Sequence, residues 1–142
     1  MDEESRLNLE QDVPAVEAFL AENGGTLACD ASVYWLTLRP RSATTERYFA
    51  RVVWTRYPHQ APSVAFATAV RGDLRVTRAW PNIPGYRVGS FDICRPFTAE
   101  GYALHSEWNS GSSAWPTVGN PFLWVAQELQ FDLDNSYSGR AA

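Results

Sequence analysis

Residues 33–39 read Val-Tyr-Trp-Leu-Thr-Leu-Arg, and residues 48–54 read Tyr-Phe-Ala-Arg-Val-Val-Trp. Both stretches are rich in branched and aromatic side chains, which favour β-strands, and the polar residues 40–46 between them predict a hairpin loop. A third strand is predicted at residues 63–68, after a proline-containing turn that cannot lie inside a strand. Together the three strands predict an antiparallel meander.

The N-terminal region predicts one short helix. Apolar side chains recur near helical spacing over residues 7–22, although Pro14 begins or breaks a helix. We expect the helix to start near Asp12 as its N-cap and to carry Pro14 in its first turn. It should end at the Asn-Gly-Gly sequence of residues 23–25.

A second helix is predicted near the other end of the chain. Asn120 is a good N-cap residue, and Pro121 fits the first helical position. Its expected buried face consists of Phe122, Val125, Ala126 and Leu129. The polar residues 132–142 predict a tail, residues 70–76 a small hairpin or an extended loop, and the weakly periodic residues 98–114 a loop.

Composition narrows the classes of protein that the chain can belong to. Its 142 residues, 45% of them hydrophobic, predict one folded domain over residues 1–142. The net charge of -4 and the lack of clustered arginines argue against a nucleic-acid partner. No apolar stretch reaches the roughly 20 residues of a membrane helix, and residues 1–4 are acidic where a signal peptide is basic. We therefore expect a cytoplasmic protein without a membrane partner.

The chain has two cysteines, Cys29 and Cys94. In a reducing compartment both are expected to be free thiols. The two histidines, His59 and His105, lie far apart, and no Cys-x-x-Cys or His-x-x-x-His spacing occurs. Neither a metal site nor a cofactor is predicted.

Short motifs follow one another in a fixed order around Cys94. The first are a Tyr-Pro turn at residues 57–58, a Pro-x-Val-x-Phe strand at residues 62–66 and a Trp-Pro-Asn-Ile turn at residues 80–83. They are followed by a glycine at residue 89, an Ile-Cys pair at residues 93–94 and a Trp-Pro pair at residues 115–116. In this order they resemble the core of ubiquitin-conjugating enzymes. That family has a His-Pro-Asn-Ile turn, a Gly-x-Ile-Cys active site and a tryptophan before the crossing helix.

The resemblance implies an α+β fold of the UBC type. Its parts are an N-terminal helix, a four-stranded antiparallel meander, an active-site loop and a crossing helix, without the C-terminal helices that usually follow. The implied partners are a ThiF-like adenylating enzyme, which docks on the first helix, a ubiquitin-like protein or the C-terminus of another protein as the modifier, and a target protein. The implied activity is that of a thioester-forming transferase.

Cys94 is the predicted nucleophile of such an enzyme, because a thiolate can accept an acyl group and later surrender it to an amine. The alternative is that Cys94 is a small buried hydrophobic residue, as most free cysteines are. By resemblance, Asn82 donates a hydrogen bond to the oxyanion, although it can equally close its own turn. The sequence departs from the family here, because Trp80 replaces the usual histidine and twelve positions separate Asn82 from Cys94.

Three further residues are candidates for binding substrate. Arg95 favours the thiolate if its guanidinium turns toward the sulfur, and Asp92 and His105 are candidates to contact or deprotonate the acceptor amine. Other acidic or polar candidates in this region are Glu100, Ser106 and Glu107. Trp115 is expected to pack in the core.

All twelve basic side chains are arginine, and lysine is absent. A GC-rich genome explains this, and so does selection against self-modification by an activated thioester. The composition is similar to that of bacterial members of the family, of the kind found in antiphage conjugation operons. Two alternatives stay open: an inactive UBC-fold module that binds a ubiquitin-like partner, and an unrelated α+β protein in which Cys94 is structural.

Overall fold

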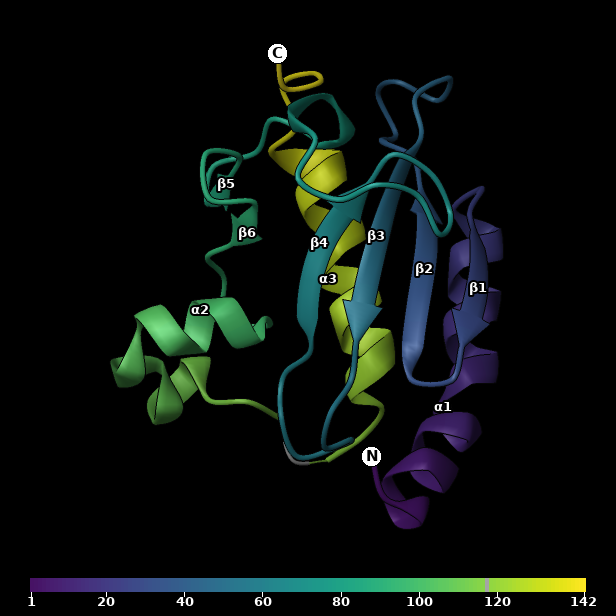
Figure 1. Ribbon diagram of the computed structural model, residues 1–142, viewed down its shortest axis with the longest axis vertical. Coiled ribbons are helices and arrows are strands. Elements are labelled where there is room, and N and C mark those ends of the chain that lie inside the picture. Colours follow the sequence, from purple (N-terminus) through teal and green to yellow (C-terminus); the bar gives the residue numbers. More distant parts are fainter. Residues whose placement is uncertain (117) are drawn as a thin grey trace.

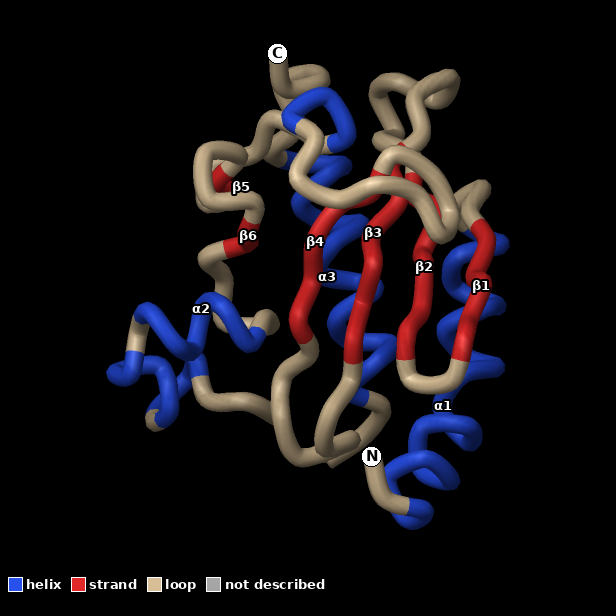
Figure 2. Tube along the Cα trace, viewed as in Figure 1, coloured by secondary structure: helices blue, strands red, loops and turns tan. Residues whose placement is uncertain are grey.

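The computed structural model describes residues 1–116 and 118–142. Its centre is a four-stranded antiparallel sheet, and two long helices, α1 and α3, pack on one face of it (Figure 1). A short ribbon, β5-β6, and the helix α2 lie beyond the β4 edge (Figure 2). The elements are α1 Glu3–Glu22, β1 Thr26–Asp30, β2 Val33–Leu38, β3 Tyr48–Val53, β4 Ser63–Ala67, β5 Tyr86–Arg87, β6 Asp92–Ile93, α2 Ala99–Leu104 and α3 Pro121–Asn135. The fold is therefore α+β.

The predicted meander is confirmed. Strands β2, β3 and β4 pair in antiparallel register, with Leu36 opposite Ala50 and Ala50 opposite Phe66. These three side chains are fully buried, because alternate residues of each strand face the helices. They belong to one apolar cluster that also takes residues from α1 and α3.

The four strands that the resemblance implied are present, but the residue patterns located only three of them and missed β1. Its side chains are exposed or half-buried and show no clear alternation, because it forms an edge of the sheet and pairs with β2. The chain reaches it through Gly24, at φ +76°, and Gly25. A Cβ on Gly25 would collide with the carbonyl oxygen of Thr37, so the close approach of α1 to the sheet edge requires glycine there.

Helix α1 is longer than predicted, and the N-cap expected at Asp12 is wrong. The helix begins at Glu3, and the side chain of Asp2 accepts a hydrogen bond of 2.8 Å from the N–H of Ser5. Pro14 lies inside the helix and not in its first turn. The apolar face on both sides of the proline is buried against the sheet and α3, which offsets the backbone hydrogen bond that proline cannot donate.

Helix α3 begins as predicted. The Asn120 side chain accepts a hydrogen bond of 2.9 Å from the N–H of Leu123, and all four residues of the predicted apolar face are buried. The helix continues to Asn135, however, so the tail predicted from residue 132 is wrong for its first residues. The rest of the tail packs on the core, with the hydroxyls of Tyr137 and Tyr48 2.6 Å apart.

One of the two predicted loop regions contains helical turns, and the other is a loop. Residues 98–114, predicted as a loop, contain α2 and two 3₁₀ turns, Ser106–Asn109 and Gly111–Ser113. Residues 70–76 form an extended loop and no hairpin. This loop covers part of the sheet face opposite the helices, where Arg71 lies 5.3 Å from the ring centroid of Trp35.

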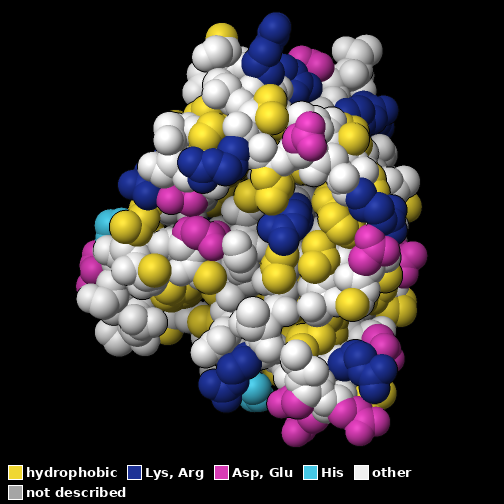
Figure 3. Space-filling view, viewed as in Figure 1, with side chains coloured by type: hydrophobic (Ala, Val, Ile, Leu, Met, Phe, Trp, Pro, Cys, Tyr) yellow, Lys and Arg dark blue, Asp and Glu magenta, His cyan; other side chains and the backbone are white. Residues whose placement is uncertain are grey.

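Figure 3 shows the face of the sheet that the helices leave open, with basic, acidic and apolar side chains interspersed on it. Arg71 also pairs there with Asp30 of β1, at 2.6 Å from Nε to Oδ2. In the parts of the chain that the structure describes, no helix has the length and apolar character needed to span a membrane.

Candidate active site

Cys94 lies directly after β6, where the β5-β6 ribbon packs beside β4. The cysteine is half-buried, whereas Ile93 before it is fully buried. The backbone N–H of Cys94 donates a hydrogen bond of 2.8 Å to the carbonyl oxygen of Gly85. The backbone is thus anchored while the residue stays partly open to solvent.

The turn after Cys94 is held by Thr98, the N-cap of α2, which is fully buried. Its hydroxyl donates to the carbonyl oxygen of Ile93 at 2.6 Å and accepts from the N–H of Gly101 at 2.9 Å. A Cβ on Gly101 would collide with the carbonyl oxygen of Arg95, so α2 packs directly on this turn. These contacts hold the backbone on both sides of Cys94.

Asn82 belongs to the turn that leads to Gly85. Its backbone N–H donates to the carbonyl oxygen of Gly139 at 2.8 Å, and its own carbonyl oxygen accepts from the N–H of Ser138 at 3.0 Å. The backbone of Asn82 therefore pairs with the C-terminal residues 138 and 139, and the residue is exposed. The bond from Cys94 to Gly85 links the cysteine backbone to the segment that begins at Asn82, but no described contact joins the Asn82 side chain to Cys94.

Trp80 occupies the position at which the resembling family has histidine. It is fully buried, with its ring centroid 5.1 Å from that of Phe66 and 6.4 Å from that of Phe91. Here the residue serves the core, since a large aromatic ring fills the space between the sheet and the turn.

Asp92 of β6 is bound by Arg87 of β5, a residue that sequence reasoning missed. Two hydrogen bonds join them, Nε to Oδ1 at 2.7 Å and Nη2 to Oδ2 at 2.8 Å. The hydrogen bond to Asp92 raises the pKa of Arg87. The acidic member of this ion pair stands two residues before Cys94 in the chain. Only the register of β5 on β6, which pairs the two residues, brings this cation to the site.

Arg95 directs its guanidinium into the protein. Its Nη2 donates to the carbonyl oxygen of Pro84 at 2.8 Å and lies 3.9 Å from Oδ1 of Asp132 in α3. The Nε atom is buried and has no hydrogen-bond partner within the described residues. In this arrangement Arg95 ties the segment around Cys94 to the turn and to the helix.

Asp132 is a buried carboxylate that the sequence placed in a polar tail. It accepts a hydrogen bond of 2.8 Å from the hydroxyl of Tyr86. Burial raises the pKa of Asp132, while the bond from Tyr86 and the charge of Arg95 oppose this shift. Burial also raises the pKa of Glu128, one helical turn earlier, and the charge of Asp132 adds to it. The helical spacing from Leu129 is the signal that places Asp132 on the buried face.

His105 and Glu100, two candidate site residues, bind residues other than Cys94. Nδ1 of His105 lies 2.8 Å from Oε1 of Glu107, and its ring stacks on Trp108 with centroids 4.1 Å apart. The hydrogen bond from His105 lowers the pKa of Glu107. Glu100 accepts a hydrogen bond of 3.1 Å from the N–H of Val64, so it fastens α2 to β4.

Next to α2 is a hollow of about 390 Å³ between this helix, the turn after β3 and Trp115. Trp115 packs as predicted, with ring centroids 6.1 Å from Trp54 and 5.6 Å from Trp124. Its Nε1 donates to the carbonyl oxygen of Pro58 at 2.8 Å. Across residues 1–116 and 118–142, no group of three or more histidine, cysteine, aspartate or glutamate side chains could hold a metal ion.

Comparison with known proteins adds no relative to this picture. No family model, no curated protein and no solved structure matches the chain. A function must therefore be argued from its own residues.

Proposed function

We propose that this protein is a carrier of the ubiquitin-conjugating type. It would accept a ubiquitin-like protein from an adenylating enzyme as a thioester on Cys94 and pass it to an amine of a target protein. The arginine-rich, lysine-free composition favours a bacterial member that acts in antiviral conjugation.

The observation that carries the proposal is the presentation of Cys94. A half-buried thiol follows a strand at the β4 edge of the meander, on a turn that Gly85 and Thr98 hold in place. A structural cysteine in the apolar core would not need this exposure. The position of the turn between the meander and α3 agrees with the motif order that led to the resemblance.

In the first step, Sγ of Cys94 attacks the carbonyl carbon of the modifier's thioester on the adenylating enzyme. A new C–S bond forms, the old C–S bond breaks, and the enzyme's sulfur leaves as a thiol that takes the proton lost by Cys94. Arg87 supports the attacking thiolate, because a nearby cation stabilises this form. ATP is consumed by the adenylating enzyme and not by this chain.

In the second step, the nitrogen of an acceptor amine attacks the Cys94 thioester. A C–N bond forms, the C–S bond breaks, and Sγ leaves as the thiolate. The exposed carboxamide of Asn82 is the proposed donor to the oxyanion. Asp92, the residue of β6 that stands two positions before Cys94, is proposed to contact the amine and receive its proton. Arg95 acts as a positioning residue, and His105 at the end of α2 is a proposed contact for the acceptor protein.

The test is a charging reaction. The purified protein is incubated with ATP and with the adenylating enzyme and ubiquitin-like protein encoded beside it, and the products are separated on a non-reducing gel. We expect an adduct that thiol reagents cleave, that Cys94→Ala abolishes and that the matched control Cys29→Ala retains. An adduct that survives in Cys94→Ala would refute the carrier function.

The same experiment decides the second candidate, an inactive module that binds a ubiquitin-like protein. If no adduct forms, and if iodoacetamide fails to react with Cys94 in the folded protein, then binding without chemistry becomes the better explanation.

A further inference from the structure

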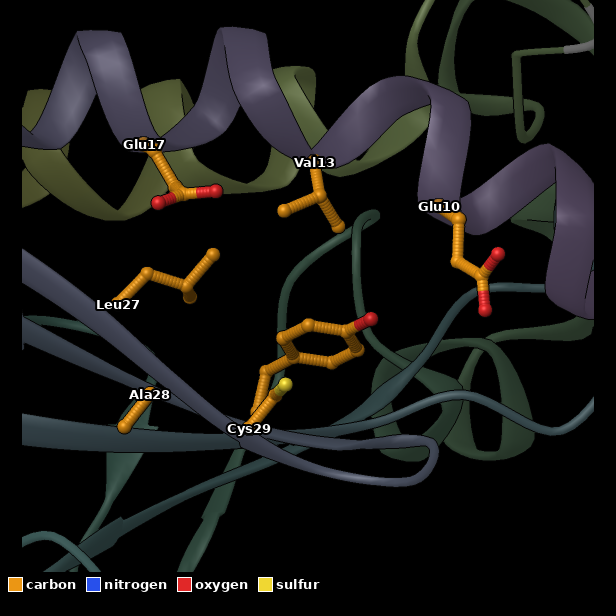
Figure 4. A pocket seen from close by; sticks show the side chains of 7 residues that line it. Glu10, Val13, Glu17, Leu27, Ala28 and Cys29 are labelled. Atoms are coloured by element: carbon orange, nitrogen blue, oxygen red, sulfur yellow. The ribbon is translucent and has the colours of Figure 1, made fainter.

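A second site lies at the opposite edge of the sheet from Cys94. A pocket of about 240 Å³ opens between helix α1 and the edge strand β1. Figure 4 shows Glu10, Val13 and Glu17 extending from the helix toward Leu27 and Cys29 on the strand. The volume is below the roughly 300–1,000 Å³ typical of small-molecule sites, and suits one long side chain.

One polar side chain in this pocket has no hydrogen-bond partner among the residues that the structure describes. Tyr34 of β2 lines the pocket and is only 4% exposed. Its ring packs edge-on against Phe122, with centroids 5.0 Å apart, but within the described residues its hydroxyl forms no hydrogen bond. The buried polar atoms without a partner do not include the Tyr34 oxygen, so this oxygen can be reached from the pocket and is free to accept a hydrogen bond from a bound group.

The groups around this hydroxyl are acidic. Burial raises the pKa of Tyr34 to about 12, and the charges of Cys29, Glu10 and Glu17 add to the shift. Tyr34 therefore stays neutral at physiological pH and offers lone pairs to a donor. Glu10 and Glu17 are exposed, and neither carboxylate takes part in an ion pair among the described residues.

Charge along the whole helix has the same sign. Helix α1 contains five glutamates and one aspartate, and its single basic residue, Arg6, lies near the first turn beside Glu3. A pocket on such a helix repels anions and attracts cations. The apolar floor that Val13 and Leu27 provide suits the methylene stem of a long basic side chain.

We propose that this pocket binds an arginine side chain of a partner protein. The guanidinium would donate to the carboxylates of Glu10 and Glu17 and to the hydroxyl of Tyr34, while the stem packs on Val13 and Leu27. Arginine fits better than a compact ammonium group, because its planar fork can address acceptors on both sides of the pocket at once. The inference does not depend on the proposed chemistry at Cys94.

The first test uses N-acetyl-arginine amide as the probe and follows the backbone amide signals of the full chain by NMR. We expect saturable shifts at Leu27, Ala28 and Cys29. The control probe is N-acetyl-citrulline amide, which has nearly the same shape without the charge and should cause no saturable shift. Equal shifts with both probes would overturn the proposal, and if arginine causes no shift the reaction of Cys29 described below decides.

Variants locate the response. The double change Glu10→Gln and Glu17→Gln should weaken binding by about fivefold, as expected for two exposed ion pairs. Tyr34→Phe keeps the packing on Phe122 and should weaken binding by removing one acceptor. Glu4→Gln changes an exposed acid of the same helix outside the pocket and should leave the affinity unchanged. An equal loss in Glu4→Gln would show attraction by the whole helix and not a pocket.

A second measurement remains informative if the small probe binds too weakly. In a Cys94→Ala background Cys29 is the sole thiol, and it can react with a cationic or an anionic methanethiosulfonate, each releasing methanesulfinate. The ratio of the two rates cancels the reactivity of the thiol itself. We expect the ratio of the cationic to the anionic rate to be several-fold higher in the folded protein than in the urea-unfolded chain. The double change Glu10→Gln and Glu17→Gln should lower the folded protein's ratio to that of the unfolded chain. A ratio that folding does not change would refute the site.

Discussion

Replacing Thr98 by valine removes the clamp on the Cys94 turn without changing the shape of the side chain. The hydroxyl of Thr98 joins the carbonyl oxygen of Ile93, at 2.6 Å, to the N–H of Gly101, at 2.9 Å. Valine has the same branched form but can make neither bond. The residue is fully buried, so water cannot replace the lost partners.

The energetic cost follows from these two orphaned groups. Each buried donor or acceptor left without a partner costs about 1–3 kcal/mol, and the loss of an N-cap, about 0.5–2 kcal/mol, overlaps with the loss at Gly101. The added methyl group recovers part of this by apolar burial. We expect Thr98→Val to lower the free energy of unfolding by about 2–4 kcal/mol, which for a chain of this size corresponds to a fall in Tm of roughly 5–15 °C.

Urea denaturation and thermal melting followed by circular dichroism measure this loss. The matched control is Thr26→Val in β1, where the threonine is exposed and the change should stay within about 0.5 kcal/mol. Alkylation of Cys94 by iodoacetamide under native conditions should also be faster in Thr98→Val, because the turn is freed locally. A loss below about 1 kcal/mol with an unchanged alkylation rate would refute the view that Thr98 holds this turn.

Three more predictions follow from the structure. Burial raises the pKa of Asp132 above its ordinary value of 3.8, so protonated Asp132 stabilises the folded protein fully below pH 3.8, and this stabilisation is lost as the pH rises through the folded-state pKa. Asp132→Asn should remove this pH-dependent loss of stability. If the unfolding free energies of the variant and the unmodified chain had identical pH profiles, the prediction would be contradicted. Arg87→Gln should slow alkylation of Cys94 about threefold at neutral pH by removing a nearby cation, and an unchanged rate would show that Arg87 does not support the thiolate. Gly25→Ala should cost about 2 kcal/mol in urea denaturation because its Cβ meets the carbonyl oxygen of Thr37, and a stability equal to that of the unmodified chain would mean that α1 and β2 can separate freely there.

The parts of the fold that local signals control were predictable from the sequence. The Asn120-Pro121 pair starts α3 because an N-cap side chain and the fixed φ of proline act within one turn. The strands β2 and β3 were predictable because their buried faces are continuous and rich in branched and aromatic residues.

Elements that depend on distant contacts were not predictable. The start of α1 at Glu3 depends on burial of Leu9 against the core, which outweighs the local signal of Pro14. Strand β1 has little apolar pattern of its own and depends on pairing with β2. Cys94 was found through its motif, but Arg87 and Asp132 come to the site through strand register and helix packing, which the order of residues does not display.

The separation of the two proposed sites gives the proposals independent tests. Cys94 follows the ribbon beside β4, whereas the acidic pocket lies at β1, with β2 and β3 between these edges (Figure 1). Substitutions that share no partner usually have additive effects, so Glu10→Gln with Glu17→Gln should leave the alkylation rate of Cys94 unchanged, and Arg87→Gln should leave arginine binding unchanged. If the acidic pocket holds the partner that delivers the modifier, charging of the variant Glu10→Gln with Glu17→Gln should be slow at low partner concentration and should reach the normal rate at high partner concentration. Slower charging that persists at saturating partner would instead mean that the pocket changes the chemistry at Cys94.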